Sequence, residues 1–202
     1  MSLIDEIKKP IHVELLIFKK KFTHTLSTDN ALLQNIIDYV LEGAGKQLRP
    51  IMVLLASKLC NGCVTDATYH TALAIEFLHN ASLIHDDVVD DTCERRGRSS
   101  INARWTNKIA VLSGDYLLAQ SLISGARTRN LEIMDAIAKI GTELSDGELL
   151  QINKSQKSKI TEADYFAIVQ KKTAILFSAC TYTGGIAANA DADKLERLRL
   201  FG

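Results

Sequence analysis

The chain of 202 residues contains little proline and few aromatic side chains, and its charges balance. Two prolines and 6% aromatic residues are a composition that suits helices better than β-sheets. The formal net charge of +0 provides no polyanion-binding surface, so we expect no nucleic-acid partner. No apolar run reaches the ~18 residues of a membrane span, and the first residues lack the basic and then apolar order of a signal peptide. We therefore expect a cytoplasmic protein without a membrane span.

The sequence also lacks the partners that its cysteines would need for chemistry. Cys60 and Cys63 form a C-x-x-C pair. A zinc site needs four ligands, and no second C-x-x-C pair exists; a thioredoxin-like redox site needs a βαβ setting, and no strand pattern surrounds the pair. The Asn61-Gly62 step between the two cysteines predicts a turn at a helix end instead.

Helical periodicity, in contrast, continues along most of the chain. Apolar residues recur every three or four positions, as in the face that contains Leu33, Ile37 and Val40, and no convincing alternating strand interrupts them. Short connections between such segments are typical of an antiparallel helix bundle, and the length suits one domain, 1–202. The predicted fold class is all-α, with helices at 10–26, 29–42, 50–59, 66–91, 108–124, 131–155, 162–188 and 193–201.

An acidic stretch ends the fourth of these helices. Asp86 and Asp90 are one turn apart and share a face, with Asp87 about 100° round the helix. His79 and Glu76 continue that face backwards. Carboxylates four residues apart repel, and negative charge opposes the dipole at a helix C-terminus, so the cluster is unfavourable without a cation. Mg²⁺ is such a cation, since it typically takes one or two carboxylates together with phosphate oxygens.

Two pairs of cations are suited to grip the same phosphates. Arg95 and Arg96 directly follow the acidic stretch. Lys46 and Arg49 flank a turn that leads into a helix, and helix N-termini favour anions. A P-loop is excluded there because Gln47 stands where Ser or Thr is needed. The other interpretation is a helix–helix turn with two incidental surface cations.

Two further polar features lie inside helices. Lys172 and Thr173 interrupt a largely apolar helix, which by itself indicates a solvated face. Glu76-x-x-His79 echoes the E-x-x-H motif of di-iron carboxylate bundles, but that site requires a second E-x-x-H, and the sequence contains none. A lone His on a helix is otherwise more often structural than a ligand.

The D-D-x-x-D pattern with R-R-G four residues later, the G-K-x-x-R-P motif, and a His seven residues before the first Asp together resemble the trans-polyprenyl diphosphate synthases. The resemblance covers about Gly43 to Thr173 and is closest to the long-chain type, such as octaprenyl and heptaprenyl diphosphate synthases. It implies the all-α isoprenoid synthase bundle, usually as a homodimer. It also implies a Mg²⁺-dependent prenyltransferase that condenses an allylic diphosphate with isopentenyl diphosphate into a long-chain polyprenyl diphosphate.

The resemblance assigns roles to individual residues. It implies that Mg²⁺ is bound by Asp86 and Asp90, and that the catalytic residues are Asp86, Asp87, Asp90 and Lys172. It implies that the substrates are bound by Lys46, Arg49, His79, Arg95, Arg96, Lys172 and Thr173. The small residues Ala81 and Ser82, five and four positions before Asp86, are expected to leave the cavity open to a long product, where bulky aromatic residues would close it.

Two other functions remain open, and one family motif is missing. A terpene cyclase also ionises an allylic diphosphate at an aspartate-rich helix, but it has no second diphosphate for Lys46, Arg49 and His79 to hold. A non-catalytic subunit of a heteromeric prenyl synthase tends to lose the aspartate motif, which is intact here. The family's second D-D-x-x-D motif does not occur in the 202 residues. We therefore expect a truncated chain without prenyl transfer activity of its own.

Overall fold

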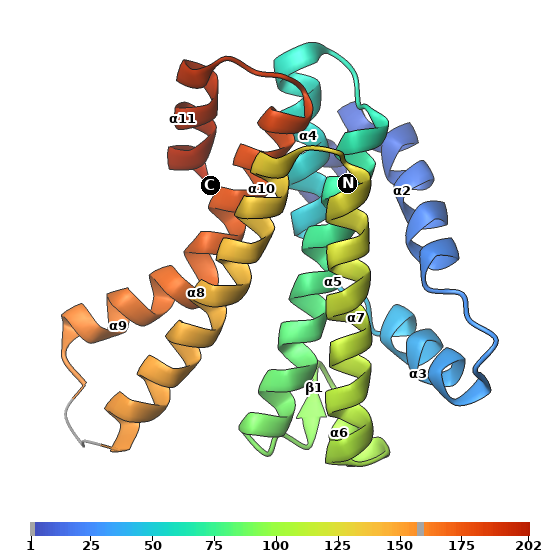
Figure 1. Cartoon of the computed structure of the whole chain (residues 1–202), viewed down its shortest axis with the longest axis vertical. Helices are drawn as coiled ribbons and strands as arrows, with labels where there is room; N and C mark the ends of the chain where they lie inside the picture. The colour runs from blue at the N-terminus through green and yellow to red at the C-terminus, as the bar shows by residue number, and fades with distance from the viewer. Residues whose placement is uncertain (1–2, 157–159) are drawn as a thin grey trace.

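Helix α5, Asp66–Val89, runs through the middle of the molecule, and the other helices pack around it (Figure 1). The computed structural model describes residues 3–156 and 160–202. The elements before α5 are α1 (Leu3–Lys8), the 3-10 turn η1 (Lys9–Ile11), α2 (His12–Thr25), α3 (Ala31–Glu42) and α4 (Leu48–Asn61). The elements after it are β1 (Glu94–Arg95), β2 (Arg98–Ser99), α6 (Ile101–Arg104), α7 (Asn107–Arg127), α8 (Leu131–Gln156), α9 (Glu162–Val169), the π-helical segment η2 (Gln170–Ala174), α10 (Ile175–Ala187) and α11 (Ala192–Phe201).

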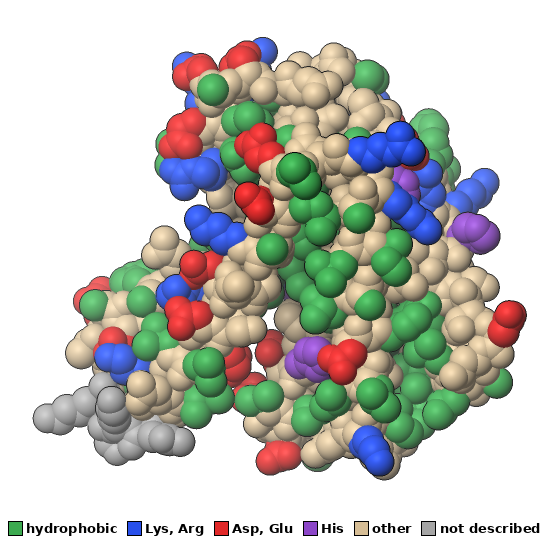
Figure 2. Space-filling view, in the orientation of Figure 1, with side chains coloured by type: hydrophobic (Ala, Val, Ile, Leu, Met, Phe, Trp, Pro, Cys, Tyr) green, Lys and Arg blue, Asp and Glu red, His purple; other side chains and the backbone are tan. Residues whose placement is uncertain are grey.

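The arrangement around α5 leaves one side of the molecule open. Helix α5 contacts α2, α4, α7, α8 and α10. Figure 1 shows α7 alongside α5, with α2 and α3 at the right and α8 to α10 at the left. Helices α8 and α9 form an arm that diverges from α5 toward the lower left, and Figure 2 shows the molecule hollowed between this arm and the lower end of the bundle. The acidic end of α5 lies at that lower end.

The predicted all-α class is confirmed, and each predicted helix is present within the described ranges. The helix expected at 50–59 begins earlier, at Leu48, because Pro50 lies in the first turn, where a backbone N–H has no intrahelical partner. The helix expected at 162–188 consists of α9, η2 and α10 in succession. The hairpin of β1 and β2 was not predicted, since strands of two residues are too short to show alternation.

Capping boxes begin two of the described helices. Thr65 and Thr68 form a capping box at the start of α5, and Thr161 and Asp164 form one at the start of α9. Each box satisfies backbone N–H groups that would otherwise lack a partner in the first turn. The caps therefore fix where α5 begins, and with it the register of every charged residue along it.

The turn predicted between Cys60 and Cys63 is also present. Gly62 caps α4 with a φ of 71°, in the left-handed region that favours glycine. Both cysteines are free thiols.

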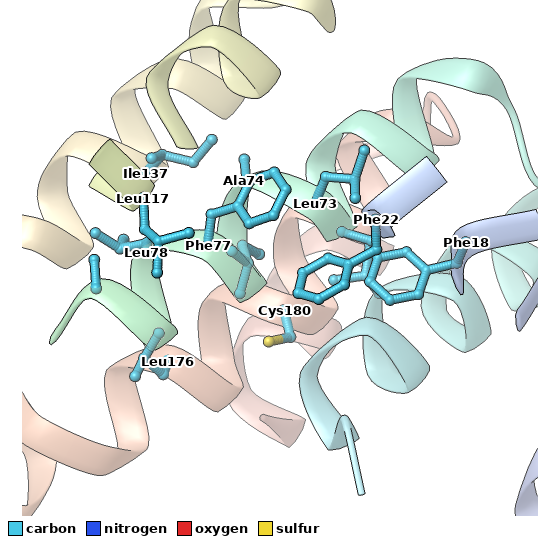
Figure 3. Packing of buried hydrophobic residues seen from close by; sticks show 14 of the residues in the cluster. Phe18, Phe22, Leu73, Ala74, Phe77, Leu78, Leu117, Ile137, Leu176 and Cys180 are labelled. Atoms are coloured by element: carbon cyan, nitrogen blue, oxygen red, sulfur yellow. The ribbon is translucent and has the colours of Figure 1, made fainter. Parts of the chain in front are cut away.

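Aromatic and aliphatic side chains surround α5 in the core (Figure 3). Phe77 of α5 stacks on Phe22 of α2 with ring centroids 5.1 Å apart, and Phe22 stacks on Phe18 at 5.6 Å. Leu117 of α7 and Ile137 of α8 extend the same buried cluster. Since full burial of one such side chain contributes roughly 1.5–3 kcal/mol, α5 is held rigidly by apolar contacts on most of its faces.

Helix α7 is the one helix among the described residues that is long and apolar enough, by length and composition, to cross a membrane. The core helices of soluble bundles pass the same test, and α7 packs along α5. The expected absence of a membrane span therefore stays a prediction.

Gly184 determines how closely α10 approaches α4. A Cβ atom there would lie 2.5 Å from the carbonyl oxygen of Val53 and 3.0 Å from the Cβ of Ala56. We expect Gly184→Ala to lower the free energy of unfolding by about 1–3 kcal/mol, as overpacking does, in urea denaturation. Gly141→Ala is the matched control: nothing lies within 4 Å of its added Cβ, and alanine favours a helix by roughly 1 kcal/mol over glycine. Equal stability of the two variants would contradict this close packing.

Candidate functional site

The acidic end of α5 leads into a tight hairpin. Strands β1 and β2 are antiparallel with Arg95 opposite Arg98, so Arg96 and Gly97 form a two-residue loop. Their φ values are 55° and 76°, and positive φ at both positions is the requirement of a type I′ turn, where glycine is strongly preferred. The R-R-G sequence therefore places Arg95 within a strand and Arg96 at the tip of the turn.

Arg95 forms an ion pair with Asp87. The Nε of Arg95 donates to both carboxylate oxygens, at 2.9 and 3.0 Å, and its Nη2 lies 2.7 Å from Oδ1. Asp87 is only 3% exposed, and its bond to Arg95 raises the pKa of that guanidinium. The structure thus places Asp87 on the hairpin side of α5, where it fixes the turn. Its catalytic role, and the substrate contact of Arg95, stay predictions.

Asp86 faces α8 and η2 across the hollow. Burial raises the pKa of Asp86, and the nearby charges of Glu148 and Asp90 raise it further, while Lys172 and Arg95 act in the opposite direction. The carboxylate is therefore held in an unfavourable environment that a cation would improve.

Lys172 lies in the π-helical segment η2 and connects it to α8. Its Nζ donates to Glu148 and to Oε1 of Gln151, which is 3.0 Å away. The adjacent Lys171 pairs with other acidic residues of α8. The two adjacent lysines of η2 therefore have different partners, and π-helical turns within α-helices occur frequently at functional sites. Lys172 is the lysine whose charge reaches Asp86.

Four of the predicted substrate-binding residues line one cavity of about 390 Å³, which we call the cationic cavity. Lys46 lies in the loop just before α4, Arg49 in the first turn of α4, His79 in α5 and Arg96 at the hairpin tip. The remaining lining residues are Gly45, Gln47, Leu48, Glu76 and Asn80. The structure therefore brings together residues that are up to 50 positions apart in the numbering, from Lys46 to Arg96.

Two close contacts position the arginines of this cavity. A Cβ atom on Gly45 would lie 2.4 Å from Nη1 of Arg96, so a larger residue there would force the guanidinium to move. The same nitrogen donates to the carbonyl of Gly43 at 3.4 Å. The guanidinium of Arg49 lies over the ring of Phe177, 5.3 Å from its centroid, which orients it by a cation–π contact.

Three buried polar atoms of the cavity have no hydrogen-bond partner: Nε of Arg49, Oε2 of Glu76 and Nδ1 of His79. Burial, with the charges of Arg49 and Arg96, lowers the pKa of His79 to about 3, so its imidazole is neutral at neutral pH. Burial also raises the pKa of Glu76 to about 7, against the opposing effect of Arg49. Since buried polar groups are normally paired, these atoms indicate a site built for a polar ligand.

Three predicted residues lie outside the cationic cavity and the acidic end. Thr173 is exposed in η2. Ala81 is 2% exposed and belongs to the apolar core. Ser82 is half-buried, and its Oγ donates to the carbonyl of His79 at 2.9 Å. Because Ser82 is four residues before Asp86, it lies one turn below that residue on the same face.

Two residues of the site have no predicted role. Glu76 lies in the wall of the cationic cavity, and Glu148 binds Lys172 beside Asp86. Spacing places Glu76 on the face of His79, but the position of Glu148 follows from a contact between different helices, which spacing along a single helix does not reveal.

Asp86 and Asp90 are better suited to Mg²⁺ than to a metal ion that takes all of its ligands from the protein. In residues 3–156 and 160–202, no group of three or more His, Cys, Asp or Glu side chains is placed to hold a metal ion. Two carboxylates are enough for Mg²⁺, which keeps water and phosphate oxygens as its other ligands. Burial, and then negative neighbours, raise the pKa of Asp86, which means that its ionised form is disfavoured. A bound divalent cation would remove this penalty.

Comparison with known proteins matches most of the chain to one family. The sequence model of the Polyprenyl synthetase family matches residues 30–202. The chain is 38% identical over 164 residues to heptaprenyl diphosphate synthase component 2 of Geobacillus stearothermophilus, covering 81% of this chain and 51% of that protein. It is 32% identical over 177 residues to octaprenyl diphosphate synthase of Escherichia coli K12, covering 88% of this chain and 54% of that protein.

The fold agrees with the sequence match. The crystal structure of polyprenyl synthase from Caulobacter crescentus CB15, complexed with calcium and isoprenyl diphosphate, matches with a TM-score of 0.92 and 31% identity over 97% of this chain and 60% of that chain. The chain spans about half the length of the curated relatives it matches. Over that span the sequence, the helices and the motifs lead to one conclusion: the chain belongs to the polyprenyl synthetase family.

Proposed function

We propose that the protein is a Mg²⁺-dependent polyprenyl diphosphate synthase that joins an allylic diphosphate to isopentenyl diphosphate. The observation that carries the proposal is that one rigid helix, α5, borders two anion-binding regions. His79 lines the cationic cavity, and Asp86 stands at the acidic end with Lys172 opposite. The seven residues from His79 to Asp86 correspond to about 10 Å along the helix axis. Two diphosphates can therefore lie against one helix with their reacting carbons between them.

In the cationic cavity, isopentenyl diphosphate is held mainly by charge. Lys46, Arg49 and Arg96 supply three positive charges, and guanidinium groups bind phosphate oxygens in pairs. His79 is neutral, so it donates one N–H without adding charge. The unpartnered Nε of Arg49 is a further donor. A relative solved with isoprenyl diphosphate supports this class of ligand.

At the acidic end, the C–O bond of the allylic diphosphate breaks and its electron pair leaves with the diphosphate. Lys172, exchanging from Glu148, donates to this leaving group and stabilises the charge that develops on it. The double bond of isopentenyl diphosphate forms the new C–C bond to the allylic carbon, and the proton lost from that unit passes to the released pyrophosphate. The protein positions both substrates and excludes water, and it needs no covalent nucleophile.

Asp86 and Asp90 are the residues that would hold Mg²⁺. When bound, the cation supplies charge neutralisation for the diphosphate. Asp87 supports them indirectly in this proposal, because its ion pair with Arg95 ties the hairpin to the end of α5.

The two rival functions are distinguished by the cavity and by one relative. A terpene cyclase has a single diphosphate, which leaves the cationic cavity with Lys46, Arg49 and His79 without a role. A heteromeric synthase is favoured by the name of the Geobacillus relative, which is a component 2. Since the chain carries the intact aspartate motif, it would be the catalytic component of such an assembly.

An exposed apolar surface on α7 suits a partner subunit. Five of its residues are between 36% and 62% exposed: Val111, Leu112, Leu118, Leu122 and Ile123. Figure 2 shows hydrophobic side chains gathered over α7 on the face toward the viewer. Contiguous exposed apolar surface marks protein interfaces, and we propose that this face joins two copies in a homodimer.

Asp90→Asn and Asp91→Asn form a matched test of the metal assignment. Asp90→Asn removes a proposed Mg²⁺ ligand and is expected to lower prenyl transfer by roughly 10²-fold or more. Asp91 has a φ of 47°, a conformation that asparagine tolerates, so Asp91→Asn is expected to retain most activity. Incorporation of radiolabelled isopentenyl diphosphate by the full-length protein is the measurement. Similar activity in the two variants would refute the assignment.

The two adjacent lysines provide a second matched test. Lys172→Ala is expected to weaken allylic diphosphate binding by about 1.5–3 kcal/mol, the range for a hydrogen bond to a charged group. Lys171→Ala is expected to leave it unchanged, because Lys171 pairs with Glu143 and Asp146 at 2.5 and 2.8 Å. Lys46→Ala should weaken isopentenyl diphosphate binding instead. Calorimetric titrations in which all three variants lose affinity equally for both ligands would contradict the two-site division.

Ser82→Phe tests the control of product length. Ser82 lies one turn below Asp86 on the same face of α5, so we expect a phenylalanine there to give a shorter product with the first condensation retained. Ser82→Ala is the control, because it removes the hydroxyl bond to His79 without adding bulk. Ala81→Phe is less informative, since Ala81 is 2% exposed and overpacking would destabilise the core by about 1–3 kcal/mol. Chromatography that gives the same long product from Ser82→Phe would place the product tunnel elsewhere.

A further inference from the structure

Glu76 is the one acidic side chain among the described residues that line the cationic cavity. It is 6% exposed, and its Oε2 is buried without a hydrogen-bond partner. Burying an ionised carboxylate costs several kcal/mol unless it is paired. An acid in this position therefore needs a reason, since it opposes the cations that would bind a diphosphate.

The polar and charged groups near Glu76 come from its own helix and from three other elements. They are Arg49 of α4, Arg96 at the hairpin tip, Cys180 of α10, and Asn80 and His79 of α5. Burial is the largest effect on Glu76 and raises its pKa to about 7, whereas Arg49, Asn80 and Arg96 lower it. The two arginines therefore only partly offset the burial, and the carboxyl is balanced between its charged and neutral forms near neutral pH.

The hydrogen-bonding chemistry of a diphosphate distinguishes these two forms. A diphosphate offers only acceptor oxygens. An ionised carboxylate is also only an acceptor, and its negative charge repels the ligand across a buried cavity. A protonated carboxyl has an O–H donor and no charge, and it leaves the charge of Arg49 and Arg96 to the ligand. The orphaned Oε2 of Glu76 thus suits a diphosphate only when the group is protonated.

We propose that Glu76 takes up a proton when a diphosphate enters the cationic cavity, and that it thereby makes isopentenyl diphosphate affinity depend on pH. Glu76 is a positioning residue here, because it acts through the field of Arg49 and Arg96 on the ligand. The inference rests on the proposed function, in which this cavity binds a diphosphate. Below about pH 7 the free carboxyl is already protonated and affects binding little. Above it, each pH unit lowers the contribution of this group to affinity by up to about tenfold.

Proton-linked calorimetry tests the proposal, with pyrophosphate as the probe and Glu76→Gln as the variant. Titrations in buffers of different ionisation enthalpy, at about pH 6 and about pH 8, give the number of protons taken up for each ligand bound. The amide keeps the shape and a donor but cannot titrate. Because the ligand's own protonation change is common to both proteins, their difference isolates Glu76. We expect wild type to take up close to one more proton than the variant at the higher pH, and almost none more at the lower pH.

The affinities provide a second readout of the same equilibrium. At about pH 8 the variant is expected to bind pyrophosphate up to about tenfold more tightly than wild type, and at about pH 6 equally. The free energy of unfolding is expected to depend on pH in the same direction, falling as the pH rises. Because burial raises the pKa of Glu76 above its ordinary 4.5, wild type loses stability as the pH rises from about 4.5 to about 7, and Glu76→Gln does not.

The outcomes separate this inference from the proposed function. Equal proton uptake by two proteins that both bind pyrophosphate would overturn the role of Glu76 and leave the diphosphate site standing. Absence of binding by both folded proteins would overturn the site itself and the inference with it. If Glu76→Gln does not fold, the carboxyl ¹³C shift of Glu76 in wild type is followed over the same pH range instead. A titration that pyrophosphate leaves unchanged would overturn the proposal.

Discussion

The structure depends on the burial of charge along one apolar helix. Helix α5 contacts other helices of the bundle on several sides, and its acidic and imidazole groups are desolvated by the packing that holds it in place. The free-energy cost of this desolvation is offset differently for each group. Asp87 is neutralised by Arg95, His79 remains uncharged, Glu76 is balanced near neutrality, and Asp86 keeps an unfavourable charge. The groups that the protein does not fully compensate are those that border the cationic cavity and the hollow beside α8.

The rigid surroundings make such incomplete compensation tolerable. The capping box at Thr65 fixes the start of α5, and the stacked rings of Phe77 and Phe22 hold its middle. A flexible helix would turn its carboxylates toward water, whereas a packed helix holds them in fixed positions at the site. Lys172 shows the same feature, since it lies in a π-helical segment and its ammonium group is held by Glu148.

The fold was predictable because helical periodicity is strong and local, and α5 in particular runs as its apolar pattern predicts. The site was predictable in part. Spacing alone indicated that Asp87 lies away from the face of Asp86 and Asp90, but it did not show that the hairpin returns on that side to place Arg95 against it. The grouping of Lys46, Arg49, His79 and Arg96 came from the family resemblance rather than from spacing. Glu148 and the cavity position of Glu76 depend on helix-to-helix contacts, which no single segment encodes.

Under the proposed function, opposite polarity in the two regions would let one helix distinguish two similar ligands. The cationic cavity contains the three cations Lys46, Arg49 and Arg96 and a single acidic residue, Glu76, which is partly protonated near neutral pH. It therefore suits a diphosphate without a metal ion. The acidic end carries Asp86 and Asp90 with Glu148 nearby, and these carboxylates would repel a bare diphosphate. They suit one that arrives with divalent cations, which reverse the sign of the interaction. Under the proposed function, the metal requirement of the allylic substrate and the metal-free binding of isopentenyl diphosphate thus follow from the order of charges along α5, before any difference in the hydrocarbon chains is considered.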